Sequence, residues 1–266
     1  MTMIKYSMMT YTLMRQKCFT PADCVRVASE LKMAGIDWVT TYGEDPKVLR
    51  KMSDDAGLPV AAHTFFLRPK EGETFLSVAE RSLDDACILG APVVMIPPSP
   101  FAGVESREEN RKRWCEVLAQ IAEPAKARNI VLTVENFPGA ASPFVTAADF
   151  HEVQKQVPSL KLTFDNGNAA TGEDQIESLK ACIGDIVHVH LKDWERSTVP
   201  AEGMRQMADG AYYRAALIGE GVVDSRATVR ELERSGYTGF VNIEYEGSKY
   251  RADEGFRKVL ELLRQE

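Results

Sequence analysis

Four short segments in the second half of the chain alternate apolar and polar residues, and each carries an acid or a histidine near its end. They are NIVLTVENFPG (129–139), LKLTFDNGN (160–168), DIVHVHLKD (185–193) and GFVNIEYEG (239–247). Each is a run of β-forming residues bounded by Gly, Asn, Asp or Pro, which is typical of a buried parallel strand. Residues two apart share one face of a strand. The polar residues predicted to point inward near the strand ends are Glu135, Asp165, His190 and Glu244.

The residues between these polar positions are all apolar, as expected for the face of a strand that packs against helices. They are Leu132, Val134, Leu162, Phe164, Val187, Val189, Val241 and Ile243. A second set of polar residues shares the inward face and should lie one layer deeper. It comprises Thr133, Thr163, His188 and Asn242.

Strand and helix patterns alternate along the whole chain. Strands are predicted near 3–8, 36–40, 58–64, 92–97, 130–135, 160–165, 186–191 and 240–245. Helix-start signals lie between them: Thr20 with Asp23 indicates a capped helix that Gly35 would close, and Thr146 with Asp149 indicates another. We therefore predict an α/β protein with a single (β/α)8 barrel over residues 1–266. An open doubly wound sheet is disfavoured because residues 6–20 contain no glycine for a phosphate loop.

One connection is too long for a simple strand–helix unit. The excess lies in residues 194–218, which follow the seventh predicted strand and contain Trp194, Tyr212 and Tyr213. Long segments that leave the carboxyl end of a barrel strand are often functional. We expect a lid over the site or a contact within a homo-oligomer, and the alternative is a mobile surface loop.

Composition narrows the class of protein. The formal net charge of −7 and the pI near 5.3 argue against nucleic acid or an anionic membrane as a partner. The five cysteines form no CxxC pair, which favours free thiols in a reducing compartment, and we predict a cytoplasmic protein. The first residues, up to Lys17, are interrupted by polar residues and predict the first strand rather than a signal peptide.

Three carboxylates and one imidazole form a hard, oxygen-rich ligand set. Such a set suits one divalent cation, with Mn²⁺ favoured and Mg²⁺, Co²⁺ or Zn²⁺ as alternatives. Each residue alone has a structural explanation: Glu135 in a salt bridge, Asp165 as a helix cap, and His190 as a core histidine. Together they favour a metal site, because several unpaired acids inside a barrel repel one another without a cation.

These segments resemble a known family. VTVEN, TFDNGN, HVHLKD and NIEYEG, with GEGVVD (219–224), are similar to the sugar phosphate isomerase/epimerase group of xylose isomerase-like barrels, which includes ketose 3-epimerases, hydroxypyruvate isomerases and inosose isomerases and dehydratases. The resemblance implies that Glu135, Asp165, His190 and Glu244 bind the metal. It also implies that Glu135 and Glu244 transfer a proton through a metal-stabilised enediolate.

The same resemblance gives expectations for substrate contacts. Arg196 matches a substrate-binding arginine of the epimerases. Asn168 stands where several members have a histidine, and Ala141 stands where the epimerases have a substrate-binding glutamate. The last two differences weaken the match to a plain ketose 3-epimerase.

Further residues near the predicted strand ends are candidates for substrate binding. His63 and Lys192 would face the same mouth. The alternative explanation for His63 is a capped strand end, and that for Lys192 is an outward salt bridge with Glu195 or Asp193. Five aromatic residues near strand ends would form an apolar wall, although core packing also explains them. They are Trp38, Phe65, Phe66, Phe101 and Phe137.

The leading prediction is a metal-dependent isomerase or epimerase of a small sugar, sugar acid or keto-polyol. The alternative is a metal-dependent dehydratase of a keto-polyol such as an inosose, since a base beside a carbonyl can also eliminate a β-hydroxyl. A phosphodiesterase acting on abasic DNA shares the fold but needs more histidines than the four present and a basic groove. A barrel that binds a sugar without catalysis would not need the four candidate ligands. An unphosphorylated substrate is favoured because no clear phosphate loop is present.

Overall fold

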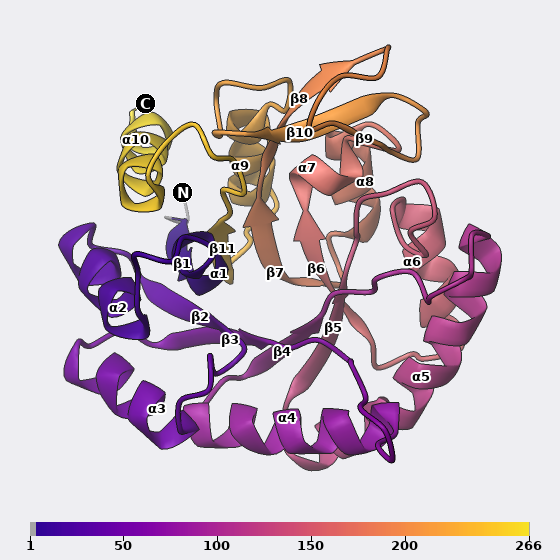
Figure 1. The fold of residues 1–266 in the computed structure, drawn as a ribbon, viewed down its shortest axis with the longest axis horizontal. Coiled ribbons are helices and arrows are strands. Elements are labelled where there is room, and N and C mark those ends of the chain that lie inside the picture. Colours follow the sequence, from indigo (N-terminus) through magenta and orange to yellow (C-terminus); the bar gives the residue numbers. More distant parts are fainter. Residues whose placement is uncertain (1–3, 266) are drawn as a thin grey trace.

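Eight parallel strands close into a barrel, with helices around its outside (Figure 1). This computed structural model describes residues 4–265. The strand order around the barrel is β1-β11-β7-β6-β5-β4-β3-β2, so that the first and last strands pair and close the ring. The predicted (β/α)8 fold is confirmed. The described residues also contain a separate three-stranded antiparallel sheet with the order β8-β10-β9.

The elements follow one another in alternation. The barrel strands are β1 (Lys5–Met9), β2 (Gly35–Val39), β3 (Val60–Thr64), β4 (Val93–Ile96), β5 (Val131–Glu135), β6 (Lys161–Asp165), β7 (Ile186–Leu191) and β11 (Phe240–Ile243). The helices are α1 (Thr10–Met14), α2 (Pro21–Glu30), α3 (Pro46–Asp55), α4 (Phe75–Leu89), α5 (Arg107–Ala127), α6 (Ala147–Gln154), α7 (Asn166–Ala169), α8 (Gln175–Cys182), α9 (Ser225–Arg234) and α10 (Ala252–Arg264). The additional sheet comprises β8 (Asp193–Ser197), β9 (Arg205–Gln206) and β10 (Tyr212–Ala216).

The predicted helix starts are present, and one predicted helix end is wrong. Thr20 with Asp23, and Thr146 with Asp149, form reciprocal capping boxes. Helix α2 ends at Glu30, and Gly35 begins β2 instead of closing the helix. A Cβ at Gly35 would lie 2.8 Å from the Phe240 ring, so the glycine permits close strand packing rather than a helix cap. Met3, which the first predicted strand included, lies outside the described residues.

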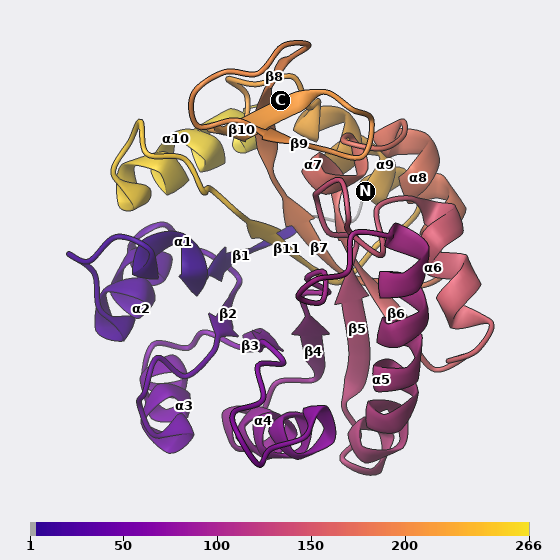
Figure 2. The ribbon, with the colours of Figure 1, turned by 45° about the vertical axis from the view of Figure 1, so that its right-hand side comes forward.

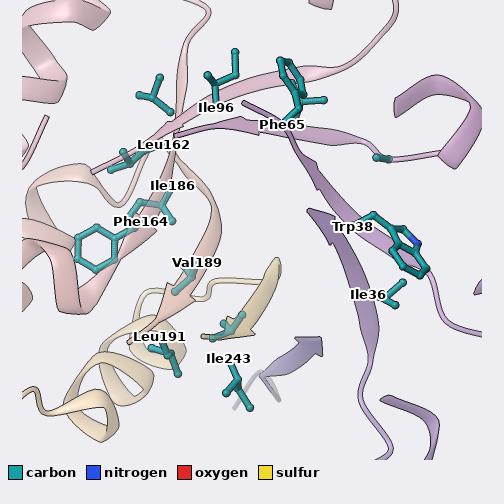
Figure 3. Packing of buried hydrophobic residues seen from close by; sticks show 14 of the residues in the cluster. Ile36, Trp38, Phe65, Ile96, Leu162, Phe164, Ile186, Val189, Leu191 and Ile243 are labelled. Atoms are coloured by element: carbon teal, nitrogen blue, oxygen red, sulfur yellow. The ribbon is translucent and has the colours of Figure 1, made fainter. Parts of the chain in front are cut away.

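The apolar face of each strand packs against the surrounding helices (Figure 3). Val134, Leu162, Phe164, Val189 and Ile243 are all buried in this core, as the alternation predicts. Burying each such side chain contributes about 1.5–3 kcal/mol, which makes this shell the main source of stability. The polar face is left to point into the barrel.

Two of the aromatic residues expected at the mouth belong to this core instead. Trp38 is fully buried and donates from Nε1 to Ser53 Oγ of α3 at 3.0 Å. Phe65 is buried in the same apolar cluster. Trp38 faces the helices because it is next to the inward-facing Asp37 on β2, and strand alternation sends every second residue outward.

The long segment after β7 is folded. β8 and β10 pair antiparallel, and β9 adds to β10 (Figure 2). A small apolar cluster of its own contains Trp194, Met207 and Tyr213. The backbone N–H of Asp209 donates to Thr171 O just beyond α7, which fixes the sheet to the barrel. The segment is therefore organised around paired strands rather than being an irregular loop throughout.

Asp193 ties the two ends of this segment together. Its carboxylate accepts hydrogen bonds from the backbone N–H groups of Trp194, Gly219, Gly221 and Val223, at 2.8–2.9 Å. A Cβ at Gly221 would lie 2.2 Å from Asp193 Oδ1, so only glycine fits there. The LKD and GEGVVD segments are thus joined through the buried carboxylate of Asp193.

Candidate metal centre

Four side chains meet at the carboxyl end of the barrel. Glu135 ends β5, Asp165 ends β6, His190 lies in β7 and Glu244 follows β11 directly. One ligand atom from each lies within 4.8 Å of the others, and all four residues are buried. His190 Nδ1 is 2.8 Å from Glu135 Oε1 and 3.4 Å from Glu244 Oε2. These residues are called the upper layer below.

Several polar atoms of the upper layer are buried without a partner. Within residues 4–265, Asp165 Oδ2 and Glu244 Oε2 accept no hydrogen bond. Asp165 Oδ1, in contrast, accepts from the backbone N–H of Asn168 at 2.7 Å and caps α7. Asp165 is therefore both a helix cap and a candidate ligand, since its second oxygen remains for a cation.

The electrostatics of the upper layer also fit a bound cation. Burial, followed by repulsion from Glu135 and Glu244, raises the pKa of Asp165 well above its ordinary value although Lys192 opposes this. Burial lowers the pKa of His190, but the carboxylates of Asp37, Glu135 and Glu244 outweigh it and raise the pKa well above its ordinary range. Without a cation, protons must therefore compensate the clustered negative charge. Oxygen and imidazole donors in this number suit a divalent ion.

Lys192 points into the barrel beside these acids. It is 4% exposed, and its Nζ lies 2.7 Å from Glu244 Oε1 and 3.5 Å from Glu246 Oε1. The alternative prediction, that Lys192 forms an outward salt bridge with Glu195 or Asp193, is wrong. Glu195 pairs with Arg214 instead, and Asp193 accepts hydrogen bonds from backbone N–H groups. Burial raises the pKa of Glu244, but Lys192 and His190 more than reverse the effect, so Glu244 is held ionised.

A second polar layer lies directly below. Asp37 of β2 accepts from Asn242 Nδ2 at 2.7 Å and lies 3.3 Å from His188 Nε2. Ser7 Oγ donates to Asn242 Oδ1, and no side-chain atom of these four residues is buried without a partner in the described chain. Asp37 Oδ2 also lies 3.8 Å from His190 Nε2. Asp37, His188, Asn242 and Ser7 are called the lower layer.

Asp37 therefore connects the two layers. Its negative charge lies on the side of the His190 ring opposite to Glu135 and Glu244. A carboxylate there favours a proton on Nε2 and leaves the Nδ1 lone pair for a cation. Burial raises the pKa of Asp37, but His188 and His190 lower it below its ordinary value.

The remaining predicted substrate residues lie in different surroundings. His63 is buried, and its Nδ1 lies 2.8 Å from Trp38 O; burial lowers its pKa, so the ring is neutral and donates to that carbonyl. Asn168 is buried, and within residues 4–265 neither polar atom of its side-chain amide has a partner. Arg196 is on β8, where it bonds to Tyr213 Oη and Asp209. No contact in the structure brings Arg196 to the upper layer.

Three residues of the site were not singled out from the sequence. Asp37 is the lone acid in the apolar run GIDWV, and Glu246 shares a strand face with Glu244 in EYEG. Asn136 bridges the strands, donating to Asp165 O at 2.7 Å and accepting from Asp165 N at 2.8 Å. The signal available for Asp37 was a polar residue inside an apolar strand. The signal available for Glu246 was its spacing of two residues from Glu244.

The closed parallel barrel and the cluster of acids and histidine at the carboxyl ends of its strands place this chain in the class of TIM-barrel proteins, with a candidate metal site. The family profile described as xylose isomerase-like TIM barrel matches residues 25–266. The chain therefore belongs to the xylose isomerase-like TIM-barrel family, as the sequence resemblance predicts.

Curated relatives within this family carry out two kinds of reaction. An inosose dehydratase of Erwinia tasmaniensis is 26% identical over 253 residues, covering 86% of this chain and 84% of the relative. The L-ribulose-5-phosphate 3-epimerase UlaE of Escherichia coli O157:H7 is 26% identical over 170 residues, covering 64% of this chain and 55% of the relative. The chain is thus similar to sugar- and polyol-modifying enzymes of both classes.

Solved structures agree on the fold. The IOLI protein with a bound zinc atom superposes with a TM-score of 0.77 at 17% identity, covering 97% of both chains. Separately, no helix within residues 4–265 has the length and apolarity that crossing a membrane requires.

Proposed function

We propose that this protein is a divalent-metal-dependent isomerase or epimerase of a small sugar, sugar acid or keto-polyol. The observation that carries the proposal is the pair of buried carboxylates, Glu135 and Glu244, from different strands, which lie 2.8 and 3.4 Å from His190 Nδ1. Moving a proton from one face of a carbon to the other needs two groups that can hold it. Two glutamates from β5 and from the end of β11 supply them.

Glu135, Asp165, His190 and Glu244 would hold the cation. When bound, it would chelate adjacent substrate oxygens and compensate the negative charge that develops beside the carbonyl. Asp165 Oδ2 and Glu244 Oε2, which are buried without a hydrogen-bond partner within residues 4–265, support this assignment. Mn²⁺ is the favoured ion on ligand hardness, and Zn²⁺ remains an alternative because the IOLI structure holds zinc.

Glu135 and Glu244 then exchange the substrate proton. One carboxylate removes it from carbon, and the other returns a proton to the neighbouring or opposite position. Lys192 stays charged beside Glu244, because the nearby carboxylates outweigh burial and raise the pKa of its ammonium well above its ordinary value. It can donate a hydrogen bond to a substrate oxygen. We assign substrate binding also to His63 and Asn168, whose buried polar atoms would meet hydroxyl groups.

Arg196 is a weaker candidate for substrate binding. Its guanidinium is held by Asp209 and Tyr213 within the β8–β10 sheet. We propose that this sheet covers the mouth, in which case Arg196 would reach substrate only after leaving Asp209. A homo-oligomer contact through the sheet is the alternative role.

The second candidate is a dehydratase, and it is favoured by the curated relatives that act on inosose. The same proton removal by Glu135 or Glu244 would be followed by loss of a β-hydroxyl. Lys192 is a buried cation at 2.7 Å from Glu244 and could protonate that leaving group. The five free cysteines fit a reducing, cytoplasmic setting for either reaction.

A single screen distinguishes the two reactions. Keto-polyols and ketoses are incubated with the Mn²⁺-loaded protein in D₂O and followed by NMR and mass spectrometry. Isomerisation or epimerisation introduces deuterium at one carbon and retains every oxygen, whereas dehydration removes one water. Absence of deuterium exchange in every compound, with metal bound, would reject proton abstraction altogether.

A further inference from the structure

A second cavity opens at the same end of the barrel as the metal centre. It has a volume of ≈ 440 Å³ and lies between the loops that follow β3 and β4. We propose that it is a subsite for an aryl or other flat apolar group carried by the substrate, which would make the substrate a substituted polyol or glycoside rather than a free sugar. This inference rests on the proposed function, because it extends the substrate bound at the metal centre.

The cavity walls are aromatic. Phe75 and Phe101 meet edge to face at 5.7 Å and 78°, and Phe101 lies 5.4 Å from Trp114. Phe66 also lines the cavity, with the Arg68 guanidinium 4.7 Å from its ring centroid. Aromatic faces of this kind bind planar apolar rings, since offset and edge-to-face contacts favour them. No carboxylate is among the residues that line the cavity in the described chain.

Hydrogen bonds hold these walls in place. Trp114 Nε1 donates to Ser99 O at 2.8 Å, which fixes the indole against the loop after β4. The buried Asn110 accepts from the backbone N–H of Phe101 at 2.8 Å and donates to Val104 O at 3.0 Å. The cavity is thus formed before a ligand arrives, which reduces the entropy lost on binding.

The strand register connects the cavity to the metal centre. Ile96 of β4 pairs with Val134 of β5. The next residue on β4 is Pro97, which lines the cavity, and the next on β5 is Glu135 of the upper layer. Neighbouring strands lie about 4.8 Å apart. Pro97, one of the residues that line the cavity, therefore lies about one strand spacing from Glu135 along the barrel rim, so one substrate can extend from the metal centre into the cavity.

The other cavities are poorer candidates for the same role. One lies against α5 and α6 and is lined by Glu108, Arg111, Lys112 and Glu152. Another lies against α2 and α10 and is lined by Lys32, Arg257 and Arg264. Both are lined by residues of the outer helices and their ends and carry many charges. Only the aromatic cavity, among these three, combines apolar walls with a place at the barrel mouth.

The test compares phenyl and methyl β-D-glucopyranoside, which differ only in the group that the cavity would receive. Dissociation constants are measured by isothermal titration calorimetry on the metal-loaded protein. Burial of the phenyl ring should make the phenyl glucoside bind at least about tenfold more tightly. Ala102→Trp fills the cavity from an exposed turn residue, and it should remove this preference while leaving methyl glucoside binding unchanged.

A matched control places the same side chain elsewhere. Ile88→Trp adds an indole at a position that is 38% exposed at the far end of α4, and it should keep the phenyl preference. Equal affinities in the parent protein, no binding of the phenyl glucoside, or a preference that survives Ala102→Trp would overturn the subsite. Metal content is measured on the same samples. A protein that prefers the phenyl glucoside but binds no metal would retain the subsite and reject the proposed function.

Discussion

The two polar layers of the barrel each contain an acid and a histidine, and they differ in how completely their polar atoms are paired. In the lower layer, Asp37 is paired by Asn242 and His188, and every buried side-chain atom has a partner. In the upper layer, Asp165 and Glu244 each keep one oxygen that has no hydrogen-bond partner within residues 4–265. Buried polar groups are normally hydrogen-bonded, so an unpaired set at a barrel mouth fits a ligand-binding role. Pairing, rather than residue type, separates structural acids from functional ones.

The largest effect is expected from breaking the lower layer. Asp37→Ala would leave the buried polar groups of Asn242 and His188 without their acceptor, and it should cost about 3–5 kcal/mol of unfolding free energy. Urea denaturation of the metal-free protein measures the loss. Asp37→Asn keeps the volume and serves as the milder control. A cost below about 1 kcal/mol for Asp37→Ala would mean that the layer is not a cooperative structural unit.

Changing the upper layer should affect turnover more than folding. Glu135→Gln and Glu244→Gln keep one ligand oxygen but remove basicity, so turnover should fall by at least about 10²-fold. Metal content is measured on the same preparations, and turnover is compared at equal metal occupancy. If either variant with full metal occupancy reacted at the parent rate, that glutamate would be only a ligand, and His63 or Lys192 would become the candidate.

Asp193 offers an independent test of the pairing rule, because it is another buried acid and both of its oxygens accept hydrogen bonds. Gly221→Ala would push a methyl group against its carboxylate and should cost about 1–3 kcal/mol of stability. Gly184→Ala, at an open position that likewise has no positive φ, is the matched control. Thermal unfolding compares the two. A larger loss for Gly184→Ala would mean that the Asp193 junction contributes little.

Metal binding should weaken as the pH falls. Without a cation, the pKa values of Asp165 and His190 lie above their ordinary values, so both groups retain protons that the cation must displace. Each displaced proton weakens apparent affinity by up to about tenfold per pH unit below the pKa concerned. Calorimetry at about pH 6 and about pH 8 measures the change. An affinity that is constant over this range would show that no proton is exchanged.

The strands and the inward residues were predictable from local alternation, and the family was predictable from the resemblance of the four segments and GEGVVD to known sequences. Glu135 and His190 were placed on the inward face because the residues that alternate with them, such as Val134 and Val189, are apolar. The contact of Asp37 with Asn242 spans 205 positions in the sequence, so no local pattern could reveal it. The sheet formed by residues 193–216 was also missed, since its short strands have little periodicity. Gly35 was misassigned because close packing against Phe240 is a tertiary effect.

The most direct test of the central claim is the amount of metal bound by the folded protein. Samples are loaded with Mn²⁺, dialysed and analysed by elemental analysis, together with Asp165→Asn and Asp37→Asn. We predict one ion per chain in the parent, substantial loss in Asp165→Asn, and retention in Asp37→Asn with weaker affinity. Removing the ion should lower the free energy of unfolding by about 2.7 kcal/mol, compared with the protein at a free-ion concentration one hundred times the dissociation constant. A parent protein that binds no ion, or binds it equally after Asp165→Asn, would contradict the assignment of the upper layer as a metal centre.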